Sequence, residues 1–416
     1  MPSLHSIALT LGLCALLSTI AAKAADWPQW QGPARDNISL ETGLLKQWPA
    51  EGPALVWKAT GLGGGFSGVS VATGRIYTMG DGADSSYVRA LDAATGKLLW
   101  SSKVGQTGGG SGFPGPRCTP TVDGDLVFAL GQFGDLVCLD ATTGTERWRR
   151  NMQKDLGGQM ASGWGYSESP LVEGDKLICT PGGPSGTVAA LNKSTGEVIW
   201  RTKDLTEKAS YVSPLMATIG GVRQLVHVMD QCVVGINPAD GSLLWRGARP
   251  ARIVATTPVI DGNLVYVSSG YGIGCNAFRV DVRDGKFTAE QVYASKELAN
   301  HHGGVVKVGA NVFGYSDTAK GWTMQDLKTG NIVWVEKTKL GKGSVTSADG
   351  MLYLRLENGK GTVVLLDPSA GAWNEKGRFD QADRSDKQSW PHPVVANGRL
   401  YLRDQDALLA YEIKAK

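Results

Sequence analysis

One spacing pattern constrains this chain more than any other feature of its sequence. An Asp or Asn is followed four positions later by Gly and, after four more, by Trp. A pattern that recurs at fixed internal spacing is typical of repeat folds, in which each unit buries its apolar face against the next. The five full copies are Asp92, Gly96, Trp100; Asp140, Gly144, Trp148; Asn192, Gly196, Trp200; Asn237, Gly241, Trp245; and Asp326, Gly330, Trp334.

A second marker extends the repeat over nearly the whole chain. A Gly in a short polar turn precedes an apolar run every 41 to 50 residues, and incomplete copies of the first pattern lie at Asp281 with Gly285 and at Asp367 with Gly371. Eight units of this length match the period of a β-propeller. The eight turn glycines are Gly74, Gly124, Gly174, Gly220, Gly262, Gly309, Gly350 and Gly398.

Each unit contains four short segments with the composition of β-strands. In the first unit they are Ser67–Ala72, Arg75–Met79, Val88–Asp92 and Lys97–Ser101. They are rich in Val, Ile, Leu and Tyr and end at Gly, Asp or Asn turns, whereas no long segment has helical periodicity. The Asp or Asn side chain can bond its own loop, the Gly can adopt positive φ, and the Trp can pack between neighbouring units. A metal loop is less favoured, since each copy offers at most one carboxylate. The sequence therefore predicts an all-β, eight-bladed propeller of four-stranded blades.

The two ends of the chain complete one blade between them. The last unit, 390–413, is one strand short, and 54–58 (Ala-Leu-Val-Trp-Lys) resembles the missing fourth strand. We expect these ends to pair, because closure removes the exposed edges of an open sheet. The propeller then spans 54–416, and 25–53 is an N-terminal extension packed on the ring. Trp27, Trp30 and Trp48 are expected to hold that extension in place.

The first 24 residues have the features of an export signal. The apolar run Ile7–Ala22 is too short to span a bilayer and is followed by Ala22-Lys23-Ala24, which predicts cleavage after Ala24 and a periplasmic or extracellular protein. A lipoprotein is the competing interpretation, because Cys14 lies in the run. The net charge of +3, from well-mixed charges, gives no indication of a nucleic-acid partner. We expect a monomer with no transmembrane segment.

The repeat copies resemble a known family. Segments such as 91–100 (Leu-Asp-Ala-Ala-Thr-Gly-Lys-Leu-Leu-Trp) are similar to the tryptophan-docking repeat of PQQ-repeat, quinoprotein alcohol-dehydrogenase-like propellers, and 26–33 (Asp-Trp-Pro-Gln-Trp-Gln-Gly-Pro) resembles the opening of secreted members. The resemblance implies a propeller. It also implies two kinds of function, because the family includes PQQ-dependent dehydrogenases as well as non-catalytic members such as the scaffold lipoprotein of the outer-membrane β-barrel assembly machine.

Candidate binding residues follow from the position of the inner strands. The residues six to ten positions before each turn Gly lead into the strand that lines the channel, so they should ring one mouth, with Trp164 nearby. Cationic side chains there would attract an anionic group, and an aromatic ring would stack on a flat one. A metal site of the three mouth histidines with Glu168 is less favoured, because adjacent residues of a strand point apart. The candidates are Arg117, Glu168, Tyr211, Arg252, His301, His302, Lys342, Trp390 and His392.

Cofactor chemistry has weaker support. Family members that oxidise alcohols typically carry an adjacent Cys pair over the quinone, an Asp base, and Glu and Asn ligands for calcium, but no two cysteines are adjacent here and no haem-attachment motif occurs. We expect the five cysteines after the leader to be buried small apolar residues, and Gly105–Gly115 to be a loop between blades.

We therefore expect a non-catalytic binding or scaffold module for a protein, a peptide or a small anionic ligand, with no cofactor firmly predicted. The alternative is a dehydrogenase of alcohols or sugars that uses PQQ with calcium. In that case Trp390 would stack on the quinone, and Arg117, Arg252 or Lys342 would bind its carboxylates.

Overall fold

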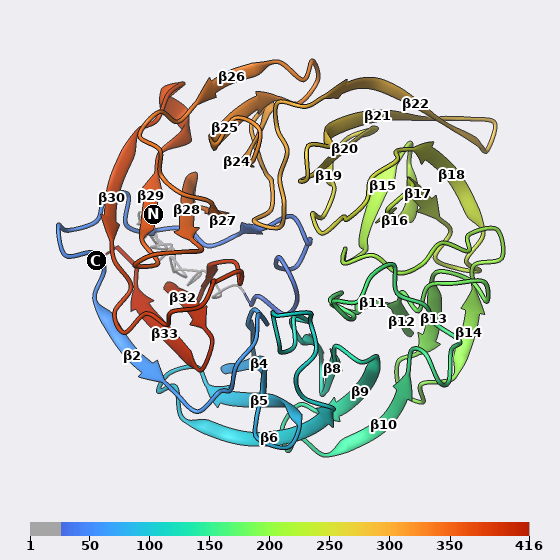
Figure 1. Cartoon of the computed structure of the whole chain (residues 1–416), viewed down its shortest axis with the longest axis horizontal. Coiled ribbons are helices and arrows are strands. Elements are labelled where there is room, and N and C mark those ends of the chain that lie inside the picture. The colour runs from blue at the N-terminus through green and yellow to red at the C-terminus, as the bar shows by residue number, and fades with distance from the viewer. Residues whose placement is uncertain (1–25, 416) are drawn as a thin grey trace, which may run out of the picture.

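Eight β-sheets are arranged in a ring around a central axis in the computed structural model, which describes residues 26–415 (Figure 1). The sheets are the blades of a propeller, as the repeat predicts. Blade 1 contains β3 (Ser70–Ala72), β4 (Arg75–Asp81), β5 (Ser86–Asp92) and β6 (Leu98–Gly105). Blade 2 contains β7 (Thr121–Asp123), β8 (Leu126–Leu130), β9 (Asp135–Asp140) and β10 (Glu146–Asn151). Blade 3 contains β11 (Leu171–Glu173), β12 (Lys176–Cys179), β13 (Ala189–Asn192) and β14 (Val198–Arg201).

The remaining blades follow in chain order around the ring. Blade 4 contains β15 (Leu215–Ile219), β16 (Val222–Met229), β17 (Cys232–Ile236) and β18 (Leu243–Ala248). Blade 5 contains β19 (Val259–Asp261), β20 (Leu264–Ser269), β21 (Gly274–Arg283) and β22 (Lys286–Ser295). Blade 6 contains β23 (Val306–Val308), β24 (Asn311–Ser316), β25 (Gly321–Asp326) and β26 (Ile332–Val335). Blade 7 contains β27 (Gly343–Ala348), β28 (Met351–Leu356), β29 (Val363–Leu366) and β30 (Glu375–Phe379), with the 3-10 helix η1 (Pro368–Ala370). Blade 8 contains β31 (Val394–Ala396), β32 (Arg399–Asp404), β33 (Ala407–Glu412) and the N-terminal β2 (Leu55–Ala59).

The turn glycines join the first and second strands of each blade. All eight have positive φ, between 58° and 76°. This backbone conformation costs little without a Cβ, so Gly allows the innermost hairpin to reverse tightly. The strands of these hairpins are mostly buried, and Cys118, Cys138, Cys179, Cys232 and Cys275 are buried and free, as expected.

The Asp/Asn–Gly–Trp pattern joins one blade to the next. The Asp92 carboxylate accepts from the Thr95 backbone N–H at 2.8 Å, which shapes the loop around Gly96. A Cβ added to Gly96 would lie 2.6 Å from the Trp57 ring, and the Trp57 indole donates to the Ala93 carbonyl at 3.3 Å. A ring of one blade therefore rests on the loop glycine of the next. The same contact joins Trp100 to Gly144, Trp148 to Gly196 and Trp200 to Gly241.

Blade 5 departs from the pattern. Its outer strands β21 and β22 form a long hairpin that reverses at Asp284 and Gly285, so Asp281 lies within a strand instead of starting a loop. The blade contacts its neighbour through Tyr293, whose ring covers Gly330 and whose hydroxyl donates to the Leu327 carbonyl at 2.9 Å. The incomplete copy of the repeat at Asp281 therefore marks a blade built from a different hairpin.

Antiparallel pairing of β2 with β33 closes the ring, as the missing strand predicts. Leu55 lies opposite Tyr411 and Ala59 opposite Leu408. The outer strand of blade 8 thus comes from the start of the chain, and Trp57 carries the contact from blade 8 to blade 1.

The chain before β2 connects the rim of blade 7 to the centre of the ring. Leu44 and Trp48 pack in the cluster shared by blades 7 and 8, and β1 (Ile38–Ser39) pairs in parallel with β27. Residues 26–37 lie at the centre of the ring, where Trp30 lines the cavity described below (Figure 1).

The seam between blades 8 and 1 yields a testable prediction. Trp57→Ala removes the ring that covers Gly96 and should lower the free energy of unfolding by about 3 kcal/mol. Thermal unfolding followed by circular dichroism should remain one transition, because closure couples all blades. Val56→Ala is the matched control, since Val56 is 42% exposed on the same strand. Equal melting temperatures for the two variants would contradict the role of Trp57.

Candidate functional site

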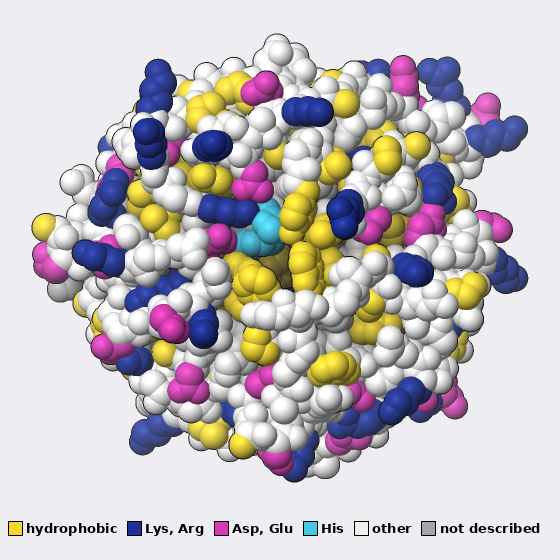
Figure 2. Space-filling view, in the orientation of Figure 1, with side chains coloured by type: hydrophobic (Ala, Val, Ile, Leu, Met, Phe, Trp, Pro, Cys, Tyr) yellow, Lys and Arg dark blue, Asp and Glu magenta, His cyan; other side chains and the backbone are white. Residues whose placement is uncertain are grey.

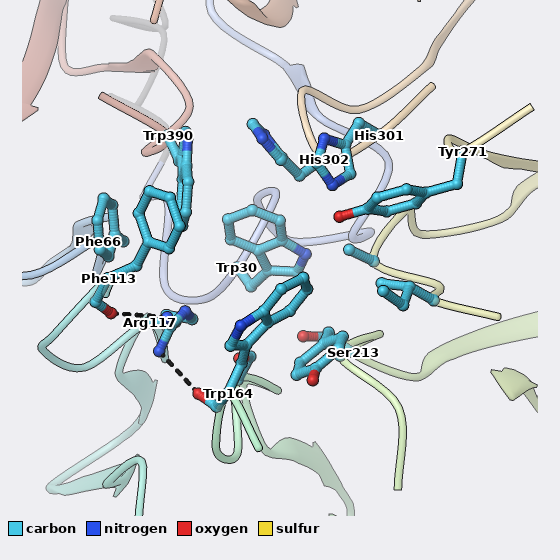
Figure 3. Close-up of a pocket in the computed structure, with 14 residues that line it drawn as sticks. Trp30, Phe66, Phe113, Arg117, Trp164, Ser213, Tyr271, His301, His302 and Trp390 are labelled. Atoms are coloured by element: carbon cyan, nitrogen blue, oxygen red, sulfur yellow. Dashed lines mark hydrogen bonds between the residues drawn. The ribbon is translucent and has the colours of Figure 1, made fainter. Parts of the chain in front are cut away.

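A cup about 270 Å³ in volume opens at one mouth of the channel. Figure 2 shows hydrophobic and histidine side chains gathered around the hollow at the centre of this face. The walls come from the loops that lead into the inner strands and from the turn between β20 and β21 (Figure 3). Seven aromatic side chains line it: Trp30, Phe66, Phe113, Trp164, Tyr211, Tyr271 and Trp390.

Three aromatic rings form one wall. Phe66 and Trp390 are stacked with ring centroids 4.1 Å apart, and Phe113 lies 5.0 Å from Trp390 (Figure 3). Phe66 precedes β3 and Trp390 precedes β31, so the wall spans the junction between blades 1 and 8. Phe113 comes from the Gly-rich loop after β6. Stacked rings held by neighbouring blades form a rigid apolar surface.

Arg117 is the one residue with a fixed charge among those that line the cup. Its guanidinium donates to the Phe113 carbonyl at 2.8 Å and to the Trp164 carbonyl at 3.1 Å (Figure 3), and it lies over the Phe66 ring at 5.5 Å. Burial lowers the pKa of Arg117, and nearby Tyr211 opposes this shift. An arginine keeps its charge in such surroundings. It holds two loops of the rim together and gives the cup a positive potential.

The opposite wall contains two neutral histidines. Burial and the charge of Lys342 lower the pKa of His301 to about 4, and burial beside His301 lowers that of His302 well below its usual range. The Lys342 ammonium lies 2.9 Å from His301 Nδ1 and 3.0 Å from an Asp317 carboxylate oxygen. Because an ammonium can only donate, Nδ1 accepts and the ring proton lies on Nε2. His301 therefore adds an N–H donor to the site.

Five of the nine candidate residues line the cup: Arg117, Tyr211, His301, His302 and Trp390. Lys342 lies behind His301, and Arg252 is exposed beside the cup without lining it. His392 is buried between His302 and the N-terminal segment, where its Nδ1 lies 2.8 Å from Asn37 Nδ2 and its ring 4.7 Å from that of Trp30. Glu168 is buried in blade 3, where it accepts from the Thr180 N–H.

The histidines and Glu168 do not form a metal site. Among residues 26–415, no three His, Cys, Asp or Glu side chains are arranged to hold an ion. Glu168 turns away from the cup toward Thr180 and Arg35, because its carboxylate is held by the Thr180 backbone.

Several lining residues could not be found from the inner-strand positions. Tyr271 lies between the second and third strands of blade 5, and Phe113 in a loop expected only to connect blades. Trp30 was expected to hold the extension on the ring, yet it also forms the floor of the cup. The one available signal is that each is a large aromatic residue within two positions of Gly or Pro in a segment without strand pattern.

A closed ring of eight blades that carries this repeat is the architecture of a PQQ-repeat β-propeller. The family profile described as outer membrane protein assembly factor BamB matches residues 84–336, and the chain belongs to this PQQ-repeat propeller family. BamB from Shewanella oneidensis is 25% identical over 260 residues, which cover 58% of this chain and 61% of that protein.

Two further similarities indicate how widely the repeat is used. The serine/threonine-protein kinase AfsK from Streptomyces griseus is 28% identical over 184 residues, 43% of this chain and 21% of the kinase. The matched regions thus span about a fifth of AfsK and about three fifths of BamB. The quinohemoprotein alcohol dehydrogenase from Comamonas testosteroni superposes with a TM-score of 0.64 at 12% identity, covering 94% of this chain and 81% of that chain, which shows the shared fold alone.

Glu168 yields a prediction on pH dependence. Burial raises its pKa to about 7, against the opposing effects of the Thr180 hydrogen bonds and Arg35. An unfolded chain releases this proton near pH 4.3, so the folded state holds a proton that the unfolded state has lost, and stability falls as pH rises from about 4 to about 7. Glu168→Gln keeps an acceptor for the Thr180 N–H and removes the loss of stability with rising pH.

Urea unfolding at pH 5 and pH 8 measures the effect. The free energy of unfolding of Glu168→Gln should be compared with that of wild type at each pH. The difference should shift in favour of the variant by roughly 1–3 kcal/mol between pH 5 and pH 8. Glu290→Gln, on the exposed strand β22, is the control and should leave the pH dependence unchanged. An unchanged pH dependence in Glu168→Gln would contradict the assignment.

Proposed function

We propose that this protein is an exported, non-catalytic binding module whose ligand site is the aromatic cup. Membership of a propeller family described as an outer membrane protein assembly factor supports a binding role. The observation that carries the proposal is the composition of the cup, in which seven aromatic rings surround one guanidinium and no carboxylate faces the cavity.

The chemistry of the lining favours binding over catalysis. The lining hydroxyls, Ser167 and Ser213, have no hydrogen-bonded base beside them, and the Ser213 oxygen accepts from the Ser169 backbone N–H at 2.8 Å. His301 uses its free ring nitrogen to accept from Lys342. General acid–base or nucleophilic catalysis requires an activated pair within reach of the substrate. His302 Nε2 lies 3.5 Å from a buried Glu357 carboxylate oxygen, but no described lining hydroxyl is hydrogen-bonded to either histidine of the cup.

The ligand must match both the size and the potential of the cup. A volume of about 270 Å³ lies just below that of drug-sized ligand pockets, so the cup accommodates a small molecule or one or two side chains of a protein or peptide. An aromatic cage suits organic cations when carboxylates accompany it. Here Arg117 reverses that preference, so the favoured ligand has an apolar, flat body and an anionic or acceptor group.

The residues of the cup do not fit PQQ with calcium, the cofactor of the alternative dehydrogenase function. Calcium requires several oxygen ligands, mainly carboxylates, and the lining offers none. Of the three cations expected to bind the quinone carboxylates, Lys342 is paired with Asp317 and Arg252 lies outside the lining, so Arg117 alone remains. The similarity to a quinohemoprotein dehydrogenase shows a shared fold alone and does not supply the missing donors.

The compartment is part of the proposal. The apolar run Ile7–Ala22 and the cleavage point after Ala24 lie outside the described residues, and we propose that they direct the protein to the periplasm or the exterior. Relatives named as outer membrane assembly factors support an envelope location. Within residues 26–415, no helix has the length and apolar character required to cross a bilayer.

Two probes of opposite charge test the binding function. Isothermal titration of the mature chain should detect binding of 1-naphthaleneacetate and not of 1-naphthylmethylamine, because both share one ring system but only the anion complements Arg117. Arg117→Gln should lower the affinity for the anion at least tenfold. Arg252→Gln, at an exposed arginine, should leave the affinity for the anion unchanged. Preference for the amine would overturn the proposed ligand class.

A separate titration tests the dehydrogenase alternative. PQQ is added with calcium to the purified chain, and cofactor absorbance and dye-linked oxidation of alcohols and sugars are recorded. We expect no stoichiometric binding and no turnover. Stoichiometric binding with turnover would replace the binding-module function with an enzymatic one.

A further inference from the structure

We propose that residues 26–37 are an internal plug that closes the propeller axis, and that Trp30 of this plug is a ligand-contacting residue at the floor of the cup. The contact role of Trp30 rests on the proposed binding function, whereas the plug itself rests on contacts within the chain. The ligand's flat apolar face would lie on the Trp30 indole, with its anionic group toward Arg117.

Arg35 attaches the plug to three successive blades. Its guanidinium donates to the Ser169 and Pro214 carbonyls, both at 2.9 Å, to the Pro170 carbonyl, and at 3.5 Å to the Thr121 hydroxyl. These acceptors lie in or just before the inner strands of blades 2, 3 and 4. The side chain is 1% exposed, and Glu168 is the carboxylate that interacts with its charge. A buried guanidinium with most of its donors used holds its partners in one geometry.

Other residues of the plug reach the remaining parts of the ring. Trp27 bridges to Val71 in blade 1, and the Trp30 indole donates to the Thr257 hydroxyl before blade 5 at 3.2 Å. The Asn37 amide donates to the Val345 carbonyl of blade 7 and contacts His392 before blade 8. Twelve consecutive residues thus contact the inner strands, or the segments leading into them, of seven of the eight blades.

The backbone of the plug adopts a conformation that needs this support. Gln31, Arg35 and Asn37 have φ values of 58°, 56° and 63°, in the left-handed region that non-glycine residues rarely occupy. Such residues persist only where the surrounding structure fixes them, and they cluster at ligand sites and clamps. Three of them within seven residues indicate a segment held in shape by the ring.

The plug also separates two cavities. Trp30 lines the cup, while the next residue, Gln31, lines a second cavity of about 220 Å³ together with Arg35 and Asp36. The two cavities have no lining residue in common. The plug therefore turns a channel into a one-sided cup.

The position of Trp30 in the cup distinguishes it from a purely structural tryptophan. Trp27 and Trp48 are 2% and 4% exposed, whereas Trp30 is only partly buried, and Figure 3 shows its ring at the centre of the cup between the Trp390 and Tyr271 walls. Partial exposure alone does not mark a ligand contact, because the packing residues Trp57 and Trp100 are also partly buried, but of these three only Trp30 lines the cup. The free face of this ring is the floor on which a ligand would stack.

Titration of the full mature chain with 1-naphthaleneacetate tests the role of Trp30. Trp30→Leu should weaken binding about tenfold, and Trp30→Phe should recover part of the loss, because Phe restores a ring. Trp48→Phe, at a tryptophan of the same N-terminal region outside the cup, should bind as the wild type does. Melting temperatures of all variants show whether each remains folded.

The outcomes separate this inference from the binding function. If Trp30→Leu binds as tightly as wild type while Arg117→Gln is weakened, Trp30 is not a contact residue, although the cup remains the ligand site. Equal weakening by Trp48→Phe and Trp30→Phe would assign both to stability and overturn the contact role. If the wild type itself fails to bind the probe, the cup function and the contact role of Trp30 both fall.

Discussion

The pairing of β2 with β33 is the interaction on which the rest of this structure depends. It places residues 55–59 at the outer edge of blade 8, so the preceding chain must run from the periphery to the axis. The same N-terminal stretch therefore closes the ring and fills its centre. Without closure, blade 8 would lack its fourth strand and blade 1 the ring that covers Gly96.

The character of the cup follows from this arrangement. Inner strands bring their preceding loops together at one mouth, and the plug supplies a floor, so aromatic rings from distant parts of the chain enclose a small volume. Burial keeps the histidines neutral and leaves Arg117 as the charge that faces the ligand. Of the carboxylates near the site, Asp317 pairs with Lys342, Glu168 accepts from Thr180, and a Glu357 oxygen lies 3.5 Å from His302 Nε2. The physical result is a rigid, apolar and weakly positive site suited to recognition.

Local signals in the sequence explain which features could be predicted. The turn glycines and the Asp–Gly–Trp spacing report local backbone geometry and a contact between successive units, so blade number, turns and closure follow from them. Arg117, Tyr211, His301, His302 and Trp390 follow because their distance from a turn Gly places them at the mouth. Arg252 and Glu168 have equivalent positions, but whether a side chain faces the axis or its own blade depends on partners such as Thr180. The plug is harder still to predict, because Arg35 donates to carbonyls 134 to 179 residues away and no spacing encodes such contacts.

Amide hydrogen exchange of the folded protein tests the account most directly. The N–H groups of Trp27, Gly32, Arg35 and Asn37 donate to backbone carbonyls at 2.8 to 3.1 Å within the plug or to blade 1. If these residues occupy the axis, their amides should exchange as slowly as those of the inner strands β7 and β15, because only opening of the ring would expose them. Exchange as fast as that of the exposed turn at Asp284 and Gly285 would show that the axis is open and would contradict the plugged, one-sided cup.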